Sequence, residues 1–207
     1  MVWLTGHSTV ISLTVALFFV TVAGENRVSA DSAKPGTVRV AGIVLKWIRG
    51  DKAANYRRAE PMIREAAAAG AKIVCTTECF LDGYAIADKN IPLTTYRALG
   101  EPIPAGPYYR RLARLAGDLK ILLVAGMLEA DGEHRCNTAA IIAPDGQLIG
   151  TYRKQFLEHE SVRNTAGTVS SVHATPFGRL GVMICADRRD PAIVRRFCES
   201  GAKSVSY

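Results

Sequence analysis

Three residues that could do covalent chemistry, Glu78, Lys154 and Cys185, each follow an apolar run that predicts a buried strand. A thiol must lose its proton to attack a carbonyl or nitrile carbon, and a nearby carboxylate can take that proton as a general base. The attacked group then develops negative charge on oxygen or nitrogen, which an ammonium group stabilises. Together the three side chains form a complete set for thiol-based acyl transfer, provided that the fold brings them to one place.

Taken singly, none of the three positions is diagnostic. Cysteine is among the residue types most often buried, so Cys185, at the end of the apolar run 182–184, fits a core thiol as well as a nucleophile. A glutamate or lysine beside a strand is by default a solvated surface residue. A cysteine–histidine pair is the competing arrangement, and it is weaker because His173 lies inside a predicted strand and His159 stands alone.

The segments that must position these side chains alternate between strand and helix patterns. Strands are predicted at residues 38–47, 72–76, 121–128, 136–143, 147–152, 172–175 and 180–184, with a last one starting at 203. Helices are predicted at residues 51–69, 107–117 and 191–201. The turns PDG (144–146) and PFGR (176–179) have the chemistry of hairpin connections. Strand–helix–strand units mixed with hairpins indicate an α/β fold with a mixed sheet.

Two of the predicted helices have specific local features. Asp51 is a candidate N-cap for the first, and Pro61 inside that helix predicts a kink or a late start. In the second, the pattern places Tyr108, Leu112 and Leu115 on the inward face.

The N-terminus has the pattern of a secretory signal. The first 24 residues contain no Asp, Glu, Lys or Arg, and the apolar stretch 10–24 is shorter than the ~20 residues of a comfortable membrane span. The sequence Val28-Ser29-Ala30 before Asp31 predicts cleavage after Ala30, or alternatively near residues 23–24. We therefore expect a signal at 1–30, a lead-in at 31–37 and one domain at 38–207, exported to the periplasm or secreted, without a stable membrane span. The alternative is an uncleaved N-terminal membrane anchor.

Composition excludes several other classes of protein. The chain of 207 residues is 48% hydrophobic and 22% charged, which is ordinary for a globular domain. Its net charge of +7 comes from scattered basic residues without a nucleic-acid motif, so no nucleic-acid partner is expected. Histidines and cysteines show no zinc-ligand spacing, so no metal is expected. Five cysteines leave at least one thiol unpaired within the chain, and Cys75 and Cys198 are predicted to be small buried residues.

Three segments carry a family resemblance in chain order. Residues 78–84 (ECFLDGY) are similar to an E-x-F-x-x-G-Y acid segment. Residues 137–139 (NTA), the turn at 145–146 and residues 152–154 (YRK) are similar to N-T-A…G…Y-R-K. Residues 178–191 (GRLGVMICADRRDP) are similar to G-x-x-G-x-x-I-C-x-D-x-R-x-P. From about residue 38 onward, the chain resembles the nitrilase superfamily of carbon–nitrogen hydrolases.

The resemblance implies specific roles. Glu78 would be the general base, Lys154 the cation beside the tetrahedral intermediate, and Cys185 the nucleophile, with the Ala186 backbone amide completing the oxyanion site. Glu160 best matches a second glutamate that positions substrate, and Glu158 is the fallback.

The resemblance also implies a fold and a reaction. The fold would be a four-layer α-β-β-α sandwich, and the chain would associate with copies of itself into a homo-oligomer. The reaction would be hydrolysis of a non-peptide C–N bond in a small molecule, through a thioester, with an amide favoured over a nitrile and with no cofactor or metal.

The chain departs from the family pattern at several points. Thr76 and Thr77 precede the acid where leucine and proline are usual, and Asp190 and Ala192 replace an aromatic or apolar residue and a glutamate. Because family members continue for several strands beyond the nucleophile, we expect a domain that is incomplete at its C-terminus. Two alternatives therefore stay open: a catalytically inactive α/β binding protein, and an acyltransferase branch of the same superfamily, which the single short apolar stretch disfavours.

Overall fold

The computed structural model describes residues 2–5, 14–15 and 37–206 of the chain, and it alternates strands and helices as predicted. The strands are β1 (Val2–Thr5), β2 (Thr14–Val15), β3 (Thr37–Ile43), β4 (Ile73–Thr76), β5 (Leu122–Asp131), β6 (His134–Ile142), β7 (Leu148–Arg153), β8 (Val172–Thr175), β9 (Gly178–Val182) and β10 (Ser204–Ser206). The helices are α1 (Lys52–Ala68), α2 (Leu93–Ala98), α3 (Pro107–Leu119) and α4 (Pro191–Glu199), with short 3-10 helices η1 (Ala85–Ala87), η2 (Glu158–Val162) and η3 (Cys185–Arg189).

The larger sheet is mixed, in the order β2-β1-β3-β4-β5-β6-β7. Strands β3, β4 and β5 are parallel to one another, whereas β6 and β7 continue the sheet as antiparallel neighbours. Strand β5 is buried along its first eight residues, as expected for a strand that is covered on both faces. The carboxyl ends of β4 and β5 therefore open at the same edge of the sheet.

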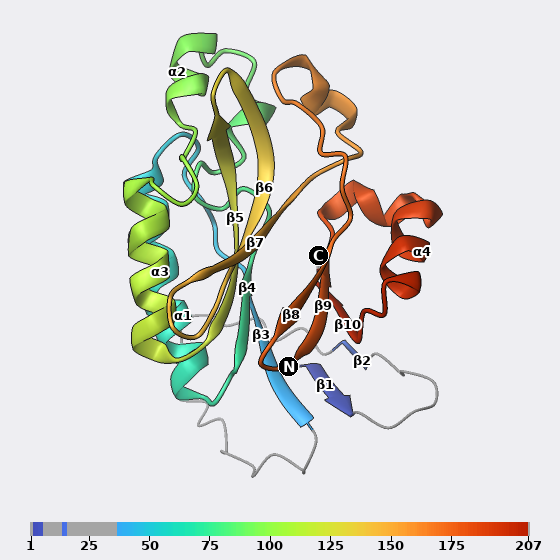
Figure 1. Cartoon of the computed structure of the whole chain (residues 1–207). Coiled ribbons are helices and arrows are strands. Elements are labelled where there is room, and N and C mark those ends of the chain that lie inside the picture. Colours follow the sequence, from blue (N-terminus) through green and yellow to red (C-terminus); the bar gives the residue numbers. More distant parts are fainter. Residues whose placement is uncertain (1, 6–13, 16–36, 207) are drawn as a thin grey trace.

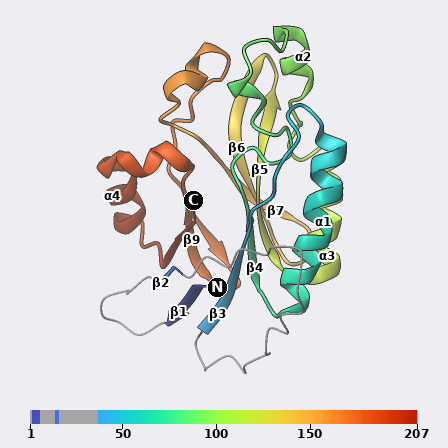
Figure 2. The same ribbon diagram turned by 180° about the vertical axis from the view of Figure 1, so that it is seen from behind.

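The molecule has four layers, as Figures 1 and 2 show from opposite sides. Helices α1 and α3 cover one face of the larger sheet, and their apolar side chains form a core with β3, β4 and β5. The smaller sheet, in the order β10-β9-β8, lies against the other face, and α4 lies outside it. A second core cluster joins Leu122 and Val124 of the larger sheet to Val182 of the smaller one and Phe197 of α4. This arrangement is the expected α-β-β-α sandwich.

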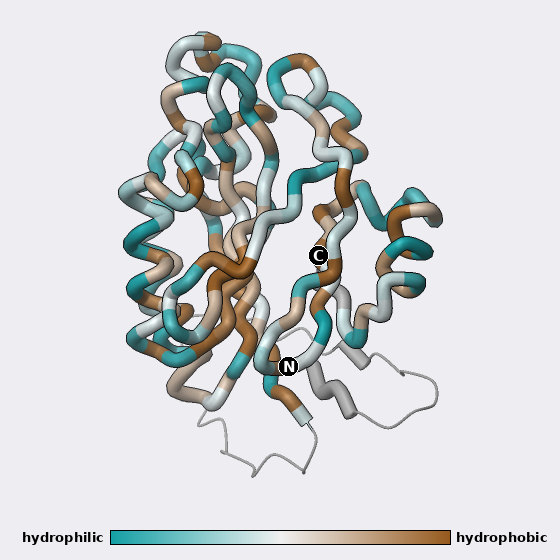
Figure 3. The backbone as a smooth tube through the Cα atoms, in the orientation of Figure 1, coloured by the Kyte–Doolittle hydropathy of each residue, from teal (hydrophilic) through white to brown (hydrophobic). Residues whose placement is uncertain are grey.

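Hydropathy follows these layers (Figure 3). Hydrophobic residues concentrate along the central strands, whereas hydrophilic and hydrophobic residues alternate along α1 and α3, which have one face in solvent. In α3 the buried residues Tyr109, Leu112 and Ala116 recur at the helical spacing i, i+3, i+7. Tyr109 is buried in this core, and the predicted Tyr108 is half-buried and packs against it.

Local sequence chemistry accounts for the ends of several elements. The Asp51 Oδ1 accepts a hydrogen bond from the Ala54 amide (2.8 Å), so Asp51 is the N-cap of α1, as predicted. Helix α1 starts at Lys52 and runs through Pro61, so the predicted late start is wrong. The predicted PDG turn joins β6 to β7, with Gly146 at φ +85°, where glycine carries no Cβ penalty.

Two predictions near the C-terminus need correction. Strand β9 ends at Val182 and not at residue 184, because the Ile184 amide donates to the Asp187 carboxylate (3.1 Å) instead of to a neighbouring strand. Cys198 is exposed and not buried, because it follows Phe197, which takes the inward position of α4. Cys75, also predicted to be buried, is half-buried.

The N-terminal prediction falls almost wholly outside the described residues. The candidate cleavage sites at residues 23–24 and after residue 30 are not among them, whereas β1 pairs with β3 in antiparallel register. Export therefore stays a prediction. Within the described part of the chain, none of the helices has the length and apolar character needed to cross a bilayer.

Candidate active site

Glu78 leaves the carboxyl end of β4, at the sheet edge expected for reactive groups in α/β folds. Its loop runs close over β5, where a Cβ on Gly126 would come within 2.5 Å of the Thr77 carbonyl oxygen. The Gly126 amide donates to the Thr76 hydroxyl oxygen (2.9 Å), which ties the loop to the strand beneath it. The Glu78 side chain is 21% exposed, so part of it reaches solvent at this edge of the sheet, while the hydrogen bond to Thr76 fixes the backbone before it.

Lys154 is the first residue after β7, and its side chain is only 2% exposed. Its Nζ lies 2.7 Å from the Glu78 Oε1 and 2.5 Å from the Glu160 Oε1. Burial lowers the pKa of Lys154, but the hydrogen bonds and charges of Glu160 and Glu78 outweigh it, so the net pKa is raised. Lys154 is thus a fixed cation between two carboxylates.

Cys185 is the first residue of η3, directly beyond β9, and it is exposed. Its φ of +47° lies in the left-handed region, which is strained for a residue with a Cβ. Desolvation of the thiol, then the negative charge of Glu78, raise the pKa of Cys185, while Lys154 and a hydrogen bond with Arg188 lower it. Burial and Glu78 therefore favour the protonated thiol, and Glu78 is the neighbouring carboxylate that can take its proton.

Asp187 holds the nucleophile turn against the segment that carries the lysine. Its buried carboxylate accepts hydrogen bonds from the Ile184 amide (3.1 Å), the Phe156 amide (2.7 Å) and the Tyr152 hydroxyl (2.8 Å). Ala186 is buried in the first turn of η3, where backbone amides have no acceptor within the helix. The turn therefore offers a backbone donor directly after the thiol.

The two candidate second glutamates have different surroundings. Glu160 is fully buried and accepts hydrogen bonds from Lys154, from the Tyr84 hydroxyl (3.1 Å), and from the side-chain amides of Asn137 (3.0 Å) and Asn164 (3.2 Å). Glu158 points outward and pairs with Arg189 on the surface (2.5 Å). The structure thus brings Glu160, and not the fallback Glu158, to the lysine.

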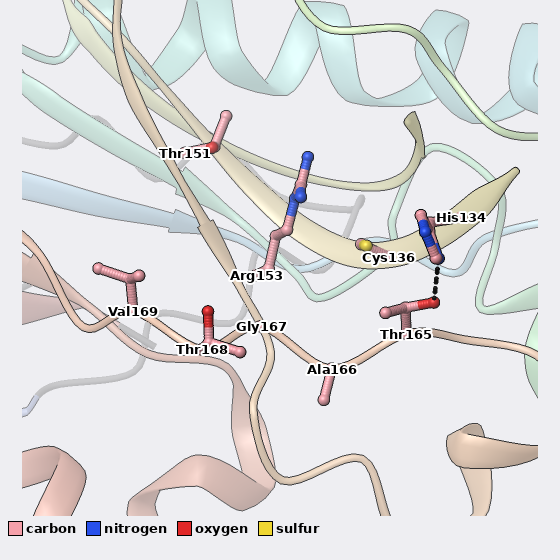
Figure 4. A pocket seen from close by; sticks show the side chains of 9 residues that line it. All are labelled: His134, Cys136, Thr151, Arg153, Thr165, Ala166, Gly167, Thr168 and Val169. Carbon is pink, nitrogen blue, oxygen red and sulfur yellow. Dashed lines mark hydrogen bonds between the residues drawn. The ribbon is translucent and has the colours of Figure 1, made fainter. Parts of the chain in front are cut away.

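A cavity of about 580 Å³ opens between the two sheets beside these groups. Glu78 and Cys185 both line it, and its wall also includes Trp47, Tyr84 and Arg188. A second cavity of about 260 Å³ lies elsewhere, along β6, β7 and the loop 165–169 (Figure 4). Its one guanidinium, from Arg153, is paired with carboxylates of β5, and none of the predicted site residues lines it.

Sequence reasoning missed four polar residues that hold the site together. Asn137 and Asp187 stood inside the recognised motifs without a role, and Tyr84 ended the acid motif. A polar residue within the apolar run of β6 was a usable signal for Asn137, because a buried amide needs partners. Asn164 lies in a loop and carried no such signal.

Comparisons with known proteins agree with this architecture. A family model described as carbon–nitrogen hydrolase matches residues 38–207. Nitrilase 3 from Arabidopsis thaliana is 35% identical over 170 residues, which cover 75% of this chain and 49% of that protein. Omega-amidase NIT2 from Homo sapiens is 34% identical over 180 residues, which cover 82% of this chain and 62% of that protein. The chain therefore spans less than two thirds of the length of either relative.

A solved structure matches in three dimensions. The crystal structure of Saccharomyces cerevisiae Nit3, described as a member of branch 10 of the nitrilase superfamily, has a TM-score of 0.72 and 30% sequence identity to this chain. The match covers 82% of this chain and 64% of the yeast chain.

Proposed function

Because the chain belongs to the carbon–nitrogen hydrolase family of the nitrilase superfamily, we propose that it hydrolyses a C–N bond other than a peptide bond, with small amides as substrates. The observation that carries this proposal is the Lys154–Glu78 pair (2.7 Å) at the cavity that Cys185 also lines. A base, a cation and a thiol at one opening are the groups that acyl transfer through a thioester requires.

The first half of the reaction forms a thioester. The Cys185 sulfur bonds to the amide carbonyl carbon while its proton passes to Glu78, and the C=O π electrons move to oxygen. The Lys154 ammonium and the Ala186 amide stabilise this oxyanion. When the C–N bond breaks, Glu78 returns its proton to nitrogen, so ammonia or an amine leaves and the acyl group stays on sulfur.

The second half consumes water. Glu78 takes a proton from the water molecule as its oxygen attacks the thioester carbon, and the C–S bond then breaks with the proton returned to sulfur. The product is a carboxylic acid, and Cys185 is restored as a thiol. In this scheme Glu160, which is fully buried, holds Lys154 in place beside the substrate.

The proposal places amides ahead of nitriles, and Omega-amidase NIT2 from Homo sapiens is the relative that favours this order. The three reacting groups alone do not make the choice, because the proton that the first step leaves on Glu78 passes either to the departing amine or to the nitrogen of a nitrile. The names of the relatives include a nitrilase and an omega-amidase. The choice between amide and nitrile is therefore tested with matched pairs of substrates.

The test measures ammonia released from short aliphatic amides and from the nitriles of the same carbon skeletons. We expect faster release from the amides, complete loss in Cys185→Ala, and retention in Cys198→Ala, which removes another exposed thiol. Equal release from wild type and Cys185→Ala would overturn the proposal, and so would the absence of release from every substrate, the result expected of an inactive binding protein. Self-association into a homo-oligomer belongs to the same proposal and is measured by sedimentation velocity.

A further inference from the structure

Asn137 contacts all three charged residues of the site from within β6. It is 1% exposed, and its Nδ2 donates to the Glu78 Oε1 (2.7 Å) and to the Glu160 Oε2 (3.0 Å). Its backbone carbonyl accepts from the Lys154 amide (2.8 Å), so the same residue also sets where the lysine leaves β7.

The site has an electrostatic difficulty that these contacts address. Glu78 and Glu160 share one cation, because Lys154 pairs with an oxygen of each, and the group carries one net negative charge. Two like charges that share a partly buried site oppose each other's ionisation. Asn137 supplies one N–H donor to each carboxylate and adds no charge of its own.

The orientation of the amide follows from its surroundings. Turned the other way, Asn137 would place its carbonyl oxygen against two acceptor-only carboxylates. In the orientation that donates to both, the buried Oδ1 has no hydrogen-bond partner among the described residues. A buried acceptor without a partner lowers stability. Asn137 therefore leaves its own buried carbonyl oxygen unpaired, which lowers stability, while its Nδ2 donates a hydrogen bond to each carboxylate.

We propose that Asn137 is a positioning residue that holds Glu78 toward the Cys185 thiol and keeps its carboxylate able to take the thiol proton. The inference rests on the proposed roles of Glu78 and Cys185 and goes beyond them, since the acyl-transfer scheme uses no group from β6. A carboxylate that loses an N–H donor is easier to protonate and freer to move, so both effects act on the same step.

Asn164 provides a matched control. Its Nδ2 donates to the same oxygen of Glu160 (3.2 Å), while its Oδ1 accepts from the Tyr96 hydroxyl. It has no hydrogen bond to Glu78. Truncating either asparagine removes one donor from Glu160, but only truncation of Asn137 removes a donor from Glu78.

The experiment follows the pH dependence of alkylation at Cys185 in wild type, Asn137→Ala and Asn164→Ala. Iodoacetamide is the probe, mass spectrometry of peptides reports each site, and exposed Cys198 is the internal reference thiol. We expect the acid limb of the Cys185 labelling rate to move up by about one pH unit in Asn137→Ala, while the Cys198 rate keeps its wild-type pH dependence. The limb in Asn164→Ala should not move up, because this variant keeps the hydrogen bond from Asn137 to Glu78. The acid limb of kcat/KM for an amide substrate should move in the same way.

Two results would overturn the inference alone: a limb in Asn137→Ala that coincides with wild type, or an equal shift in Asn164→Ala, which would place the effect at Glu160. A wild-type Cys185 that labels without an acid limb of its own contradicts the roles of Glu78 and Cys185, and so the proposed function itself. Circular dichroism checks that each variant is folded. If Asn137→Ala does not fold, Asn137→Ser, which keeps one donor, should show a smaller shift in the same direction.

Discussion

Replacing Lys154 by methionine tests whether its ammonium group is the counter-charge of the site. Methionine keeps an unbranched apolar stem in the buried position, so the main change is the loss of the charge. Glu160, which is fully buried, and Glu78, which is 21% exposed, would then face each other without a cation. Removing one partner of a buried ion pair costs about 3–5 kcal/mol, and the partial exposure of Glu78 places the expected loss near about 3 kcal/mol.

The assay is urea unfolding between pH 5 and 7.5. With a dependence of about 1–3 kcal/mol per molar urea, the midpoint of Lys154→Met should fall by about 1–3 M at pH 7. The deficit should shrink as the pH falls, because without the lysine the folded state binds protons at the carboxylates more readily than the unfolded chain does. Lys154→Met combined with Glu160→Gln should recover most of the loss.

Arg189→Met is the control for removing a cation from a surface pair. Arg189 and Glu158 are 57% and 38% exposed, so this change should cost at most about 1 kcal/mol. A Lys154→Met protein within about 1 kcal/mol of wild type at pH 7 would refute the reasoning, as would a deficit that does not depend on pH.

Three further predictions concern other parts of the chain. Burial lowers the pKa of His173, so the folded state binds a proton less readily than the unfolded chain does. Thermal melts should therefore show that the stability of the wild type falls below about pH 6.5. The His173→Gln variant should not show this fall. Asp187→Asn should lower the free energy of unfolding by about 2 kcal/mol and slow the alkylation of Cys185. The reason is that the new side-chain NH2 group would face the backbone amides of Phe156 and Ile184, which are themselves donors. Asp190→Asn is the control, because asparagine is also a good N-cap and the change should have little effect. If the N-terminal signal is cleaved as proposed, N-terminal sequencing of exported protein begins at Asp31, and a chain in the export fraction that retains Met1 contradicts this cleavage.

Most elements of the fold were predictable because their signals are local. The cap at Asp51, the PDG turn and the inward positions Leu112 and Leu115 each depend on residues a few positions away. The early end of β9 was harder to predict, although the acceptor is close in the chain. The Asp187 carboxylate takes the Ile184 amide, and its position is set by hydrogen bonds from the distant Phe156 amide and Tyr152 hydroxyl.

By itself, the sequence determined the α/β class, the order of its elements and the three residue types, Glu78, Lys154 and Cys185, that acyl transfer would need. Only the tertiary structure decided how charges pair: Glu160 and not Glu158 joins Lys154, and Asn137 lies between the two carboxylates. The physical reason is that caps, turns and periodicity are set by neighbours in the chain. Hydrogen bonds between Glu78, Asn137 and Lys154, by contrast, join β4, β6 and β7 and exist only once these strands have packed into one sheet.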